Sequence, residues 1–111
     1  MLTLSGIINI QMIKGAIPEL ARLLKEHNCF LILNDSREAV PDVSTIDIYS
    51  LPKFFSEMLS EAGVQVHKLR RAIIVSKDMN EFAFFETVSR NRAQNVMLFR
   101  DPDEAKKWLK E

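Results

Sequence analysis

The chain has 111 residues, and its 15 Lys and Arg residues balance its 15 Asp and Glu residues at a formal net charge of zero. This length predicts one domain over residues 1–111, because two halves would each be too small to close a hydrophobic core. A zero balance excludes a general attraction to nucleic acid or anionic lipid, so such binding would need a local patch. The 47% of hydrophobic residues is typical of a globular protein.

The chain shows no feature of a membrane or secreted protein. No apolar stretch approaches the ~18–20 residues of a transmembrane helix, and the first residues lack the basic region of a signal peptide. The single cysteine, Cys29, cannot form an internal disulfide, which fits a reducing compartment. We therefore expect a cytoplasmic protein without membrane insertion.

Four short apolar runs predict strands, at residues 2–4, 29–33, 72–75 and 96–99. The last three runs are uninterrupted, which is typical of strands that are covered on both faces in a parallel sheet. A segment with helical spacing follows each run. The sequence therefore predicts an α/β fold of βαβαβαβα order, with a mostly parallel central sheet and helices packed on it.

Two prolines fall inside the first two helical segments. Pro18 predicts a kink or two abutting helices in the segment that begins near Ile10. Ser44 followed by Asp47 predicts the start of the second segment, which Pro52 divides into two stretches. Gly63 stands where a left-handed helix end is expected.

The last two helices carry clear start signals. Asp78 with Glu81 predicts a capping box for the third helix. For the fourth, Asp101 is the expected cap and Pro102 the first helical residue.

Several motifs resemble a known family. Asn34-Asp35-Ser36-Arg37 follows one strand, residues 71–75 form the next, and residues 95–99 precede Asp103-Glu104-Ala105-Lys106-Lys107-Trp108-Leu109. Over about residues 4–110 this order resembles the SpoIIAA-like family of small bacterial and archaeal proteins, related to STAS domains. The resemblance implies a sheet with helices packed against it, similar also to Sec14-type lipid-binding domains. It favours a non-enzymatic regulatory or protein-interaction module.

The chain departs from the family pattern at two places. Relatives usually carry one or two more strands before the glycine that Gly6 resembles, so we expect an exposed sheet edge and a homodimer formed through it. The region from Asp42 to Asp47 lacks the glycine of the anti-anti-sigma phosphorylation motif. Ser44 and Thr45 are still the best candidate phosphoacceptors, because a phosphate is favoured at a helix N-terminus. The alternative is that Ser44 is only a helix cap.

Ligands of open parallel sheets tend to bind beyond the carboxyl ends of the strands. The residues expected at that edge, beside the start of the Ser44 helix, are candidates for binding a ligand or partner: Asp35, Ser36, Arg37, Ser76, Lys77, Asp78 and Arg100. The cations and the helix N-terminus could hold an anion such as a phosphoserine or a carboxylate. The alternative is that the acids are caps and the bases are their ion-pair partners.

Two further groups are open to more than one interpretation. Lys68, Arg70 and Arg71 are a weak nucleic-acid signal, and we interpret them as a solvated sheet edge. The aromatic residues could line a cavity for an apolar ligand or simply cover the sheet. They are Phe54, Phe55, Phe82, Phe84 and Phe85. A cavity would favour the alternative function, a carrier or sensor of a small apolar or anionic ligand.

No catalytic or metal-binding motif occurs in the sequence. His27 and His67 have no evident pairing with Cys29, and the common nucleophile, zinc and phosphate motifs are missing. We therefore predict no enzyme, no cofactor and no metal. A hydrolase or transferase would need a site assembled from scattered loops.

Overall fold

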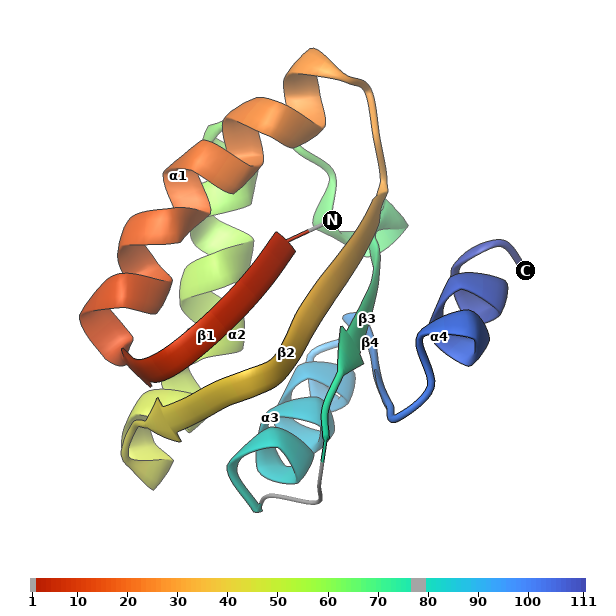
Figure 1. The fold of residues 1–111 in the computed structure, drawn as a ribbon. Helices are drawn as coiled ribbons and strands as arrows, with labels where there is room; N and C mark the ends of the chain where they lie inside the picture. Colours follow the sequence, from red (N-terminus) through yellow and green to blue (C-terminus); the bar gives the residue numbers. More distant parts are fainter. Residues whose placement is uncertain (1, 77–79) are drawn as a thin grey trace.

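Strands and helices alternate along the whole chain in a computed structural model (Figure 1). The structure describes the backbone of residues 2–76 and 80–111, and the side chains of residues 9–40, 42–76 and 80–111. In chain order the elements are β1 Leu2–Asn9, α1 Ile10–Glu26, β2 Leu31–Asp42, α2 Thr45–Glu61, a 3-10 turn Val66–Lys68, β3 Arg70–Ile74, α3 Asn80–Asn91, β4 Asn95–Phe99 and α4 Pro102–Leu109. The predicted α/β class is confirmed.

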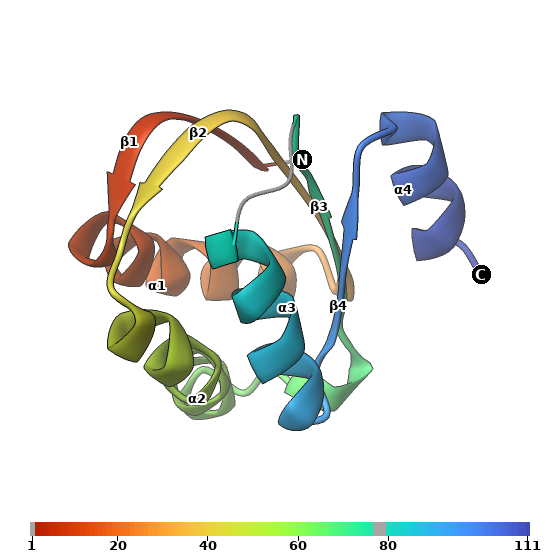
Figure 2. The same ribbon diagram turned by 90° about the horizontal axis from the view of Figure 1, so that it is seen from below.

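The four strands form one parallel sheet in the order β1-β2-β3-β4. Each of the first three helices connects one strand to its neighbour, and all three connections step in the same direction. Right-handed crossovers of this kind place their helices on a single face of the sheet. Figure 2 shows this arrangement, with α1, α2 and α3 on one side and α4 alone on the other.

β3 is buried on both faces. Ala72 and Ile74 pack against α4, whereas Ile73 and Val75 face the cluster that contains Phe85 of α3. A third cluster joins α1 and α2 to the sheet; its buried members are Ile17, Ala21, Leu24, Ile32, Phe55, Leu59, Val64 and Leu69. This double coverage explains the uninterrupted apolar run that predicted β3.

β2 is much longer than the strand predicted at residues 29–33, because it continues through the polar segment after Leu33 as far as Asp42. Its pairing with β3 ends at Asp35↔Ile74, but its pairing with β1 continues to Asn9↔Asp42. An irregularity between Thr3 and Ser5 of β1 shifts the register there. Because α4 lies over β3 and β4, the far half of β2 has one open face, where polar residues are tolerated (Figure 2).

α1 and α2 are each continuous, so the predicted division of α2 at Pro52 is wrong. A proline inside a helix costs about 3 kcal/mol, because it removes one backbone hydrogen bond and crowds the preceding turn. In α2 the buried residues Leu51 and Phe55 flank the proline, and Phe55 packs in one core cluster with Ile32 of β2, which helps to offset this cost. The Gln94 side chain also donates a hydrogen bond to the Pro52 carbonyl, at 2.8 Å.

The helix ends follow the predicted capping chemistry where the structure describes them. Ser44 Oγ accepts a hydrogen bond from Asp47 N at 3.1 Å, and Asp101 caps α4. Gly63 has φ +85°, and the bond from Val64 N to Leu59 O closes a left-handed helix end. The predicted cap Asp78 lies outside the described residues.

The outer edge of β4 is blocked by side chains of α3. Leu98 N donates to Glu86 Oε2 at 2.7 Å, and Arg90 Nε donates to Val96 O at 3.0 Å. These groups occupy backbone positions that another strand would otherwise use. At the opposite end of the sheet, β1 has β2 as its one strand neighbour in the described chain.

The end of α3 stores backbone strain that a glycine would relieve. Ala93 has φ +61° in the same kind of helix end that Gly63 forms after α2. We expect Ala93→Gly to raise the free energy of unfolding by about 0.5–1 kcal/mol, measured by urea denaturation. The control Ala83→Gly, in the exposed middle of α3, should instead lower it by about 1 kcal/mol. Destabilisation by both variants would contradict the strain.

Candidate functional site

The structure brings three of the predicted site residues together where β2 passes the end of β3. The Arg37 guanidinium donates two hydrogen bonds to the Asp35 carboxylate, from Nε at 2.9 Å and from Nη2 at 2.6 Å. Ser76 Oγ donates to the Arg37 carbonyl oxygen at 2.9 Å. These contacts join the middle of β2 to the segment that follows β3.

The pair of Asp35 and Arg37 is partly shielded from water. The Asp35 side chain is 12% exposed and that of Arg37 45%. Hydrogen bonding to Arg37 holds the pKa of Asp35 below its ordinary value, although burial acts in the opposite direction. Much of the Arg37 charge is therefore already compensated by Asp35. This arrangement favours the alternative that the basic residues of this edge are ion-pair partners of its acids.

The other predicted residues of this edge are placed differently. Ser36 is buried, at 3% exposure. Arg100 is exposed and follows β4, whose register with β3 ends at Ile74↔Phe99, so Arg100 lies at the same edge as Ser76. Lys77 and Asp78 lie outside the described residues. Anion binding at this edge stays a prediction.

The N-terminus of α2 does not open beside this cluster, contrary to the expectation. β2 continues from Arg37 to Asp42 before α2 begins at Thr45. Five residues of extended chain span roughly 15 Å. The longer strand therefore carries Ser44 and Thr45 away from Ser76, and the protein has two separate candidate regions.

Exposed apolar residues flank Ser44 and Thr45 in the sequence and stand on the neighbouring first turn of α1. β1 and β2 end side by side at Asn9↔Asp42, so the first turns of α1 and α2 lie at one end of the molecule (Figure 1). We call this region the α1/α2 corner; its members are Met12, Val40, Ser44, Thr45, Ile46 and Tyr49. Ile46 is 79% exposed and Tyr49 is 59% exposed. These values are high for large apolar side chains.

Sequence reasoning missed the apolar residues of the α1/α2 corner, although a signal was present. The buried face of α2 includes Ile48, Leu51 and Phe55, which follow one another at helical spacing. Ile46 and Tyr49 fall outside this stripe. Apolar residues on the outer face of an amphipathic helix are the pattern that would have marked them.

Arg70 and Arg71 do not form the solvated edge that we expected. Because side chains alternate along β3, the two arginines point to opposite faces of the sheet. Arg70 lies over the Trp108 ring at 4.4 Å and donates to Glu111 O at 2.8 Å. Arg71 lies instead between the rings of Phe55 and Phe85, at 5.1 and 5.3 Å from their centroids.

The phenylalanines suggested as cavity walls mostly cover the sheet. Phe55 is buried in the cluster of α1 and α2, Phe54 packs against that cluster, and Phe82 and Phe85 pack against Ile73 and its neighbours. An open groove of about 460 Å³ lies elsewhere, between α1 and α2. Its lining residues are Pro18, Ala21, Arg22, Lys25, Met58, Glu61 and Ala62.

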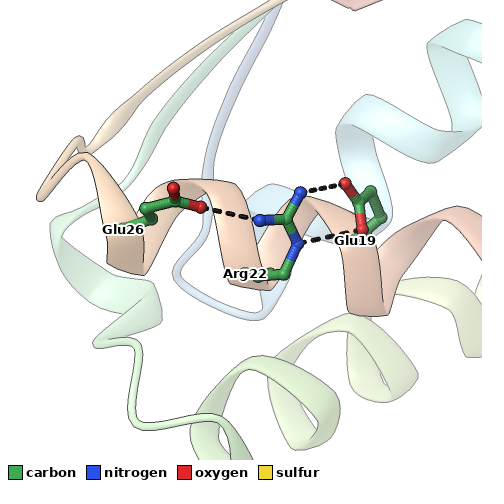
Figure 3. Close-up of polar contacts among 3 residues, drawn as sticks. All are labelled: Glu19, Arg22 and Glu26. Carbon is green, nitrogen blue, oxygen red and sulfur yellow. Dashed lines mark hydrogen bonds and ion pairs between the residues drawn. The ribbon is translucent and has the colours of Figure 1, made fainter.

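Surface ion pairs engage the arginine of this groove. Arg22 lies between Glu19 and Glu26 on α1 (Figure 3) and contacts Glu26 Oε2 at 2.7 Å. Such exposed pairs along one helix are common and mark no site by themselves. The groove therefore offers a mixed polar and apolar surface whose arginine is already paired.

The structure describes the two histidines and the cysteine, for which the sequence indicated no pairing. His27 and His67 are exposed, and Cys29 is half-buried just before β2, with its Sγ donating to Leu31 O at 3.4 Å. Among the described residues, no three His, Cys, Asp or Glu side chains are grouped as metal ligands. In the same part of the chain, no helix is long and apolar enough to cross a membrane.

Comparisons with protein-family models, with curated proteins and with solved structures each find no match to this chain. The candidate regions are therefore defined by their own geometry.

The pair of Asp35 and Arg37 predicts a pH dependence of stability. Because the folded pKa of Asp35 is lowered, its contribution is present above the unfolded pKa of about 3.9 and is lost as the pH falls through the folded pKa. We expect Asp35→Asn to flatten this part of the acid limb in urea unfolding measured over a pH series. Arg37→Met should flatten it equally, and an unchanged acid limb in that variant would contradict the assignment.

Proposed function

We propose that the chain is a non-enzymatic regulatory or protein-interaction module of the SpoIIAA-like, STAS-related type, acting in the cytoplasm. We place its partner-binding surface at the α1/α2 corner. The observation that supports this proposal is the exposure of Ile46 and Tyr49 directly beside the candidate phosphoacceptors Ser44 and Thr45.

The composition of the α1/α2 corner suits a protein partner. Tyrosine is enriched at the energetic centres of interfaces, because its ring supplies contact area and its hydroxyl a hydrogen bond. Ile46 projects from the same turn of α2, and burying apolar area of this kind contributes about 25 cal/mol per Å². A partner with an apolar anchor would remove both side chains from water.

Phosphorylation would regulate this surface. Ser44 Oγ already accepts a hydrogen bond from Asp47 N, so a phosphate on Ser44 would lie where the helix N-terminus favours negative charge. Thr45 is exposed in the next position. A charge of about −2 beside Ile46 and Tyr49 would disfavour an apolar partner. The α1/α2 corner would then act as a switch between bound and free states.

We expect Ile46→Asp and Tyr49→Asp to weaken partner binding at least about tenfold, because a buried charge replaces an apolar anchor. Partners retained from host cells by the wild-type protein would be purified and their affinities measured by calorimetry. Leu23→Asp, at an exposed apolar position near the end of α1, is the matched control and should bind normally.

The phosphorylation arm uses the same purified partner. Ser44→Glu and Thr45→Glu should weaken binding, whereas Ser60→Glu, at the far end of α2, should not. Equal binding by all variants, or equal loss in Leu23→Asp, would place the interface elsewhere. A small ligand in the native mass spectrum of purified protein would favour the carrier alternative.

We also propose a homodimer formed through the β1 edge. Glu86 and Arg90 block the edge of β4, so β1 is the edge available for strand pairing with a second copy. Sedimentation should give twice the monomer mass, and β1 amides should become slower to exchange as dimer forms. A monomer at all concentrations would contradict this proposal.

A further inference from the structure

Arg71 is a partly exposed cation whose guanidinium lies against two aromatic rings. It lies on β3 and its guanidinium is flanked by Phe55 of α2 and Phe85 of α3, at 5.1 and 5.3 Å from the ring centroids. Burial lowers its pKa to about 10, so the group stays charged at neutral pH. The aromatic faces attract the cation but cannot accept its hydrogen bonds.

No acidic side chain compensates this charge among the described residues. Arg71 takes part in none of the ion pairs that the structure describes, such as those of Arg22 with its two glutamates and of Arg37 with Asp35. Glu86 follows Phe85 directly in α3. Its carboxylate accepts a hydrogen bond from Leu98 N at the edge of β4. A charge that is shielded from water on part of its surface and has no counter-charge is costly, so proteins usually pair it or use it to bind a ligand.

Asn34 adds a second unused donor beside the guanidinium. Its Oδ1 accepts a hydrogen bond from Arg71 Nε at 2.8 Å. This bond fixes the orientation of the amide, because a flipped amide would bring the Nδ2 donor against the Nε donor. The Nδ2 group then has no partner, although Asn34 is 1% exposed. Buried amide donors are nearly always hydrogen-bonded, so an orphaned one beside a cation needs an acceptor.

We propose that Arg71 and Asn34 bind the carboxylate of a small monocarboxylic acid. A carboxylate has two oxygens in one plane, which matches the planar fork of a guanidinium and leaves one oxygen to accept from Asn34 Nδ2. Phe55 and Phe85 suit an apolar body attached to that carboxylate. Arg71 is partly exposed, so part of the residue is open to a ligand in solution. This inference does not depend on the α1/α2 corner.

The choice of a carboxylate over a phosphate follows from the donors present. A phosphate presents three strong acceptor oxygens, whereas the two aromatic walls supply no further donors. Arg71 and Asn34 can thus donate to the two oxygens of a carboxylate, but they leave the third oxygen of a phosphate without a donor.

The test uses benzoate as probe, with benzamide as its neutral counterpart and inorganic phosphate as the alternative anion. Benzoate should raise the unfolding temperature of the wild-type protein and shift the amide NMR signals of Asn34, Phe55 and Phe85. Benzamide and phosphate should do neither. Equal effects of benzamide, stronger effects of phosphate, or no benzoate effect would each overturn the proposal.

Three variants keep the test independent of folding. Asn34→Asp places a carboxylate within the protein at 34, so it should raise stability and abolish benzoate binding. Arg71→Met should weaken binding at least about tenfold. Arg70→Met, which removes the arginine on the opposite face, should bind benzoate normally. Binding that survives in Asn34→Asp and Arg71→Met would show that benzoate sits elsewhere.

Discussion

The burial of β3 on both faces is the constraint on which the rest of this fold depends. Its apolar side chains must meet α4 on one side and the elements around α3 on the other. A parallel neighbour can be added on each edge only through a helical crossover, which places α2 and α3 on the same face. The cluster of Asp35, Arg37 and Ser76 and the Arg71 site both lie on this central strand or directly beside it.

The opposite half of the sheet is built less completely. β1 and the far part of β2 are covered by α1 and α2 on one face, while α4 lies over β3 and β4 on the other (Figure 2). The open face accommodates polar residues such as Glu38, and it leaves Val40 exposed near the strand end. The α1/α2 corner is thus the place where the incompletely covered half of the sheet meets two helix starts.

Much of the fold could be predicted because its signals are local. Apolar runs that are buried on two faces indicated β3 and β4, and the side chains of Ser44 and Asp101 cap helices where expected. The length of β2 could not be predicted, because its second half is formed by pairing with a strand distant in sequence. The environment of Arg71 was missed for the same reason, since Phe55 and Phe85 approach it only after α2 and α3 pack together.

The hydrogen bond from Gln94 to the Pro52 carbonyl has a mechanical consequence. Pro52 supplies no backbone donor, so α2 is held together by fewer of its own bonds at that turn than elsewhere. Gln94 fastens this turn to the segment between α3 and β4 from outside the helix. This bond therefore ties the turn of α2 that follows Ile46 and Tyr49 to a segment more than 40 residues later in the chain.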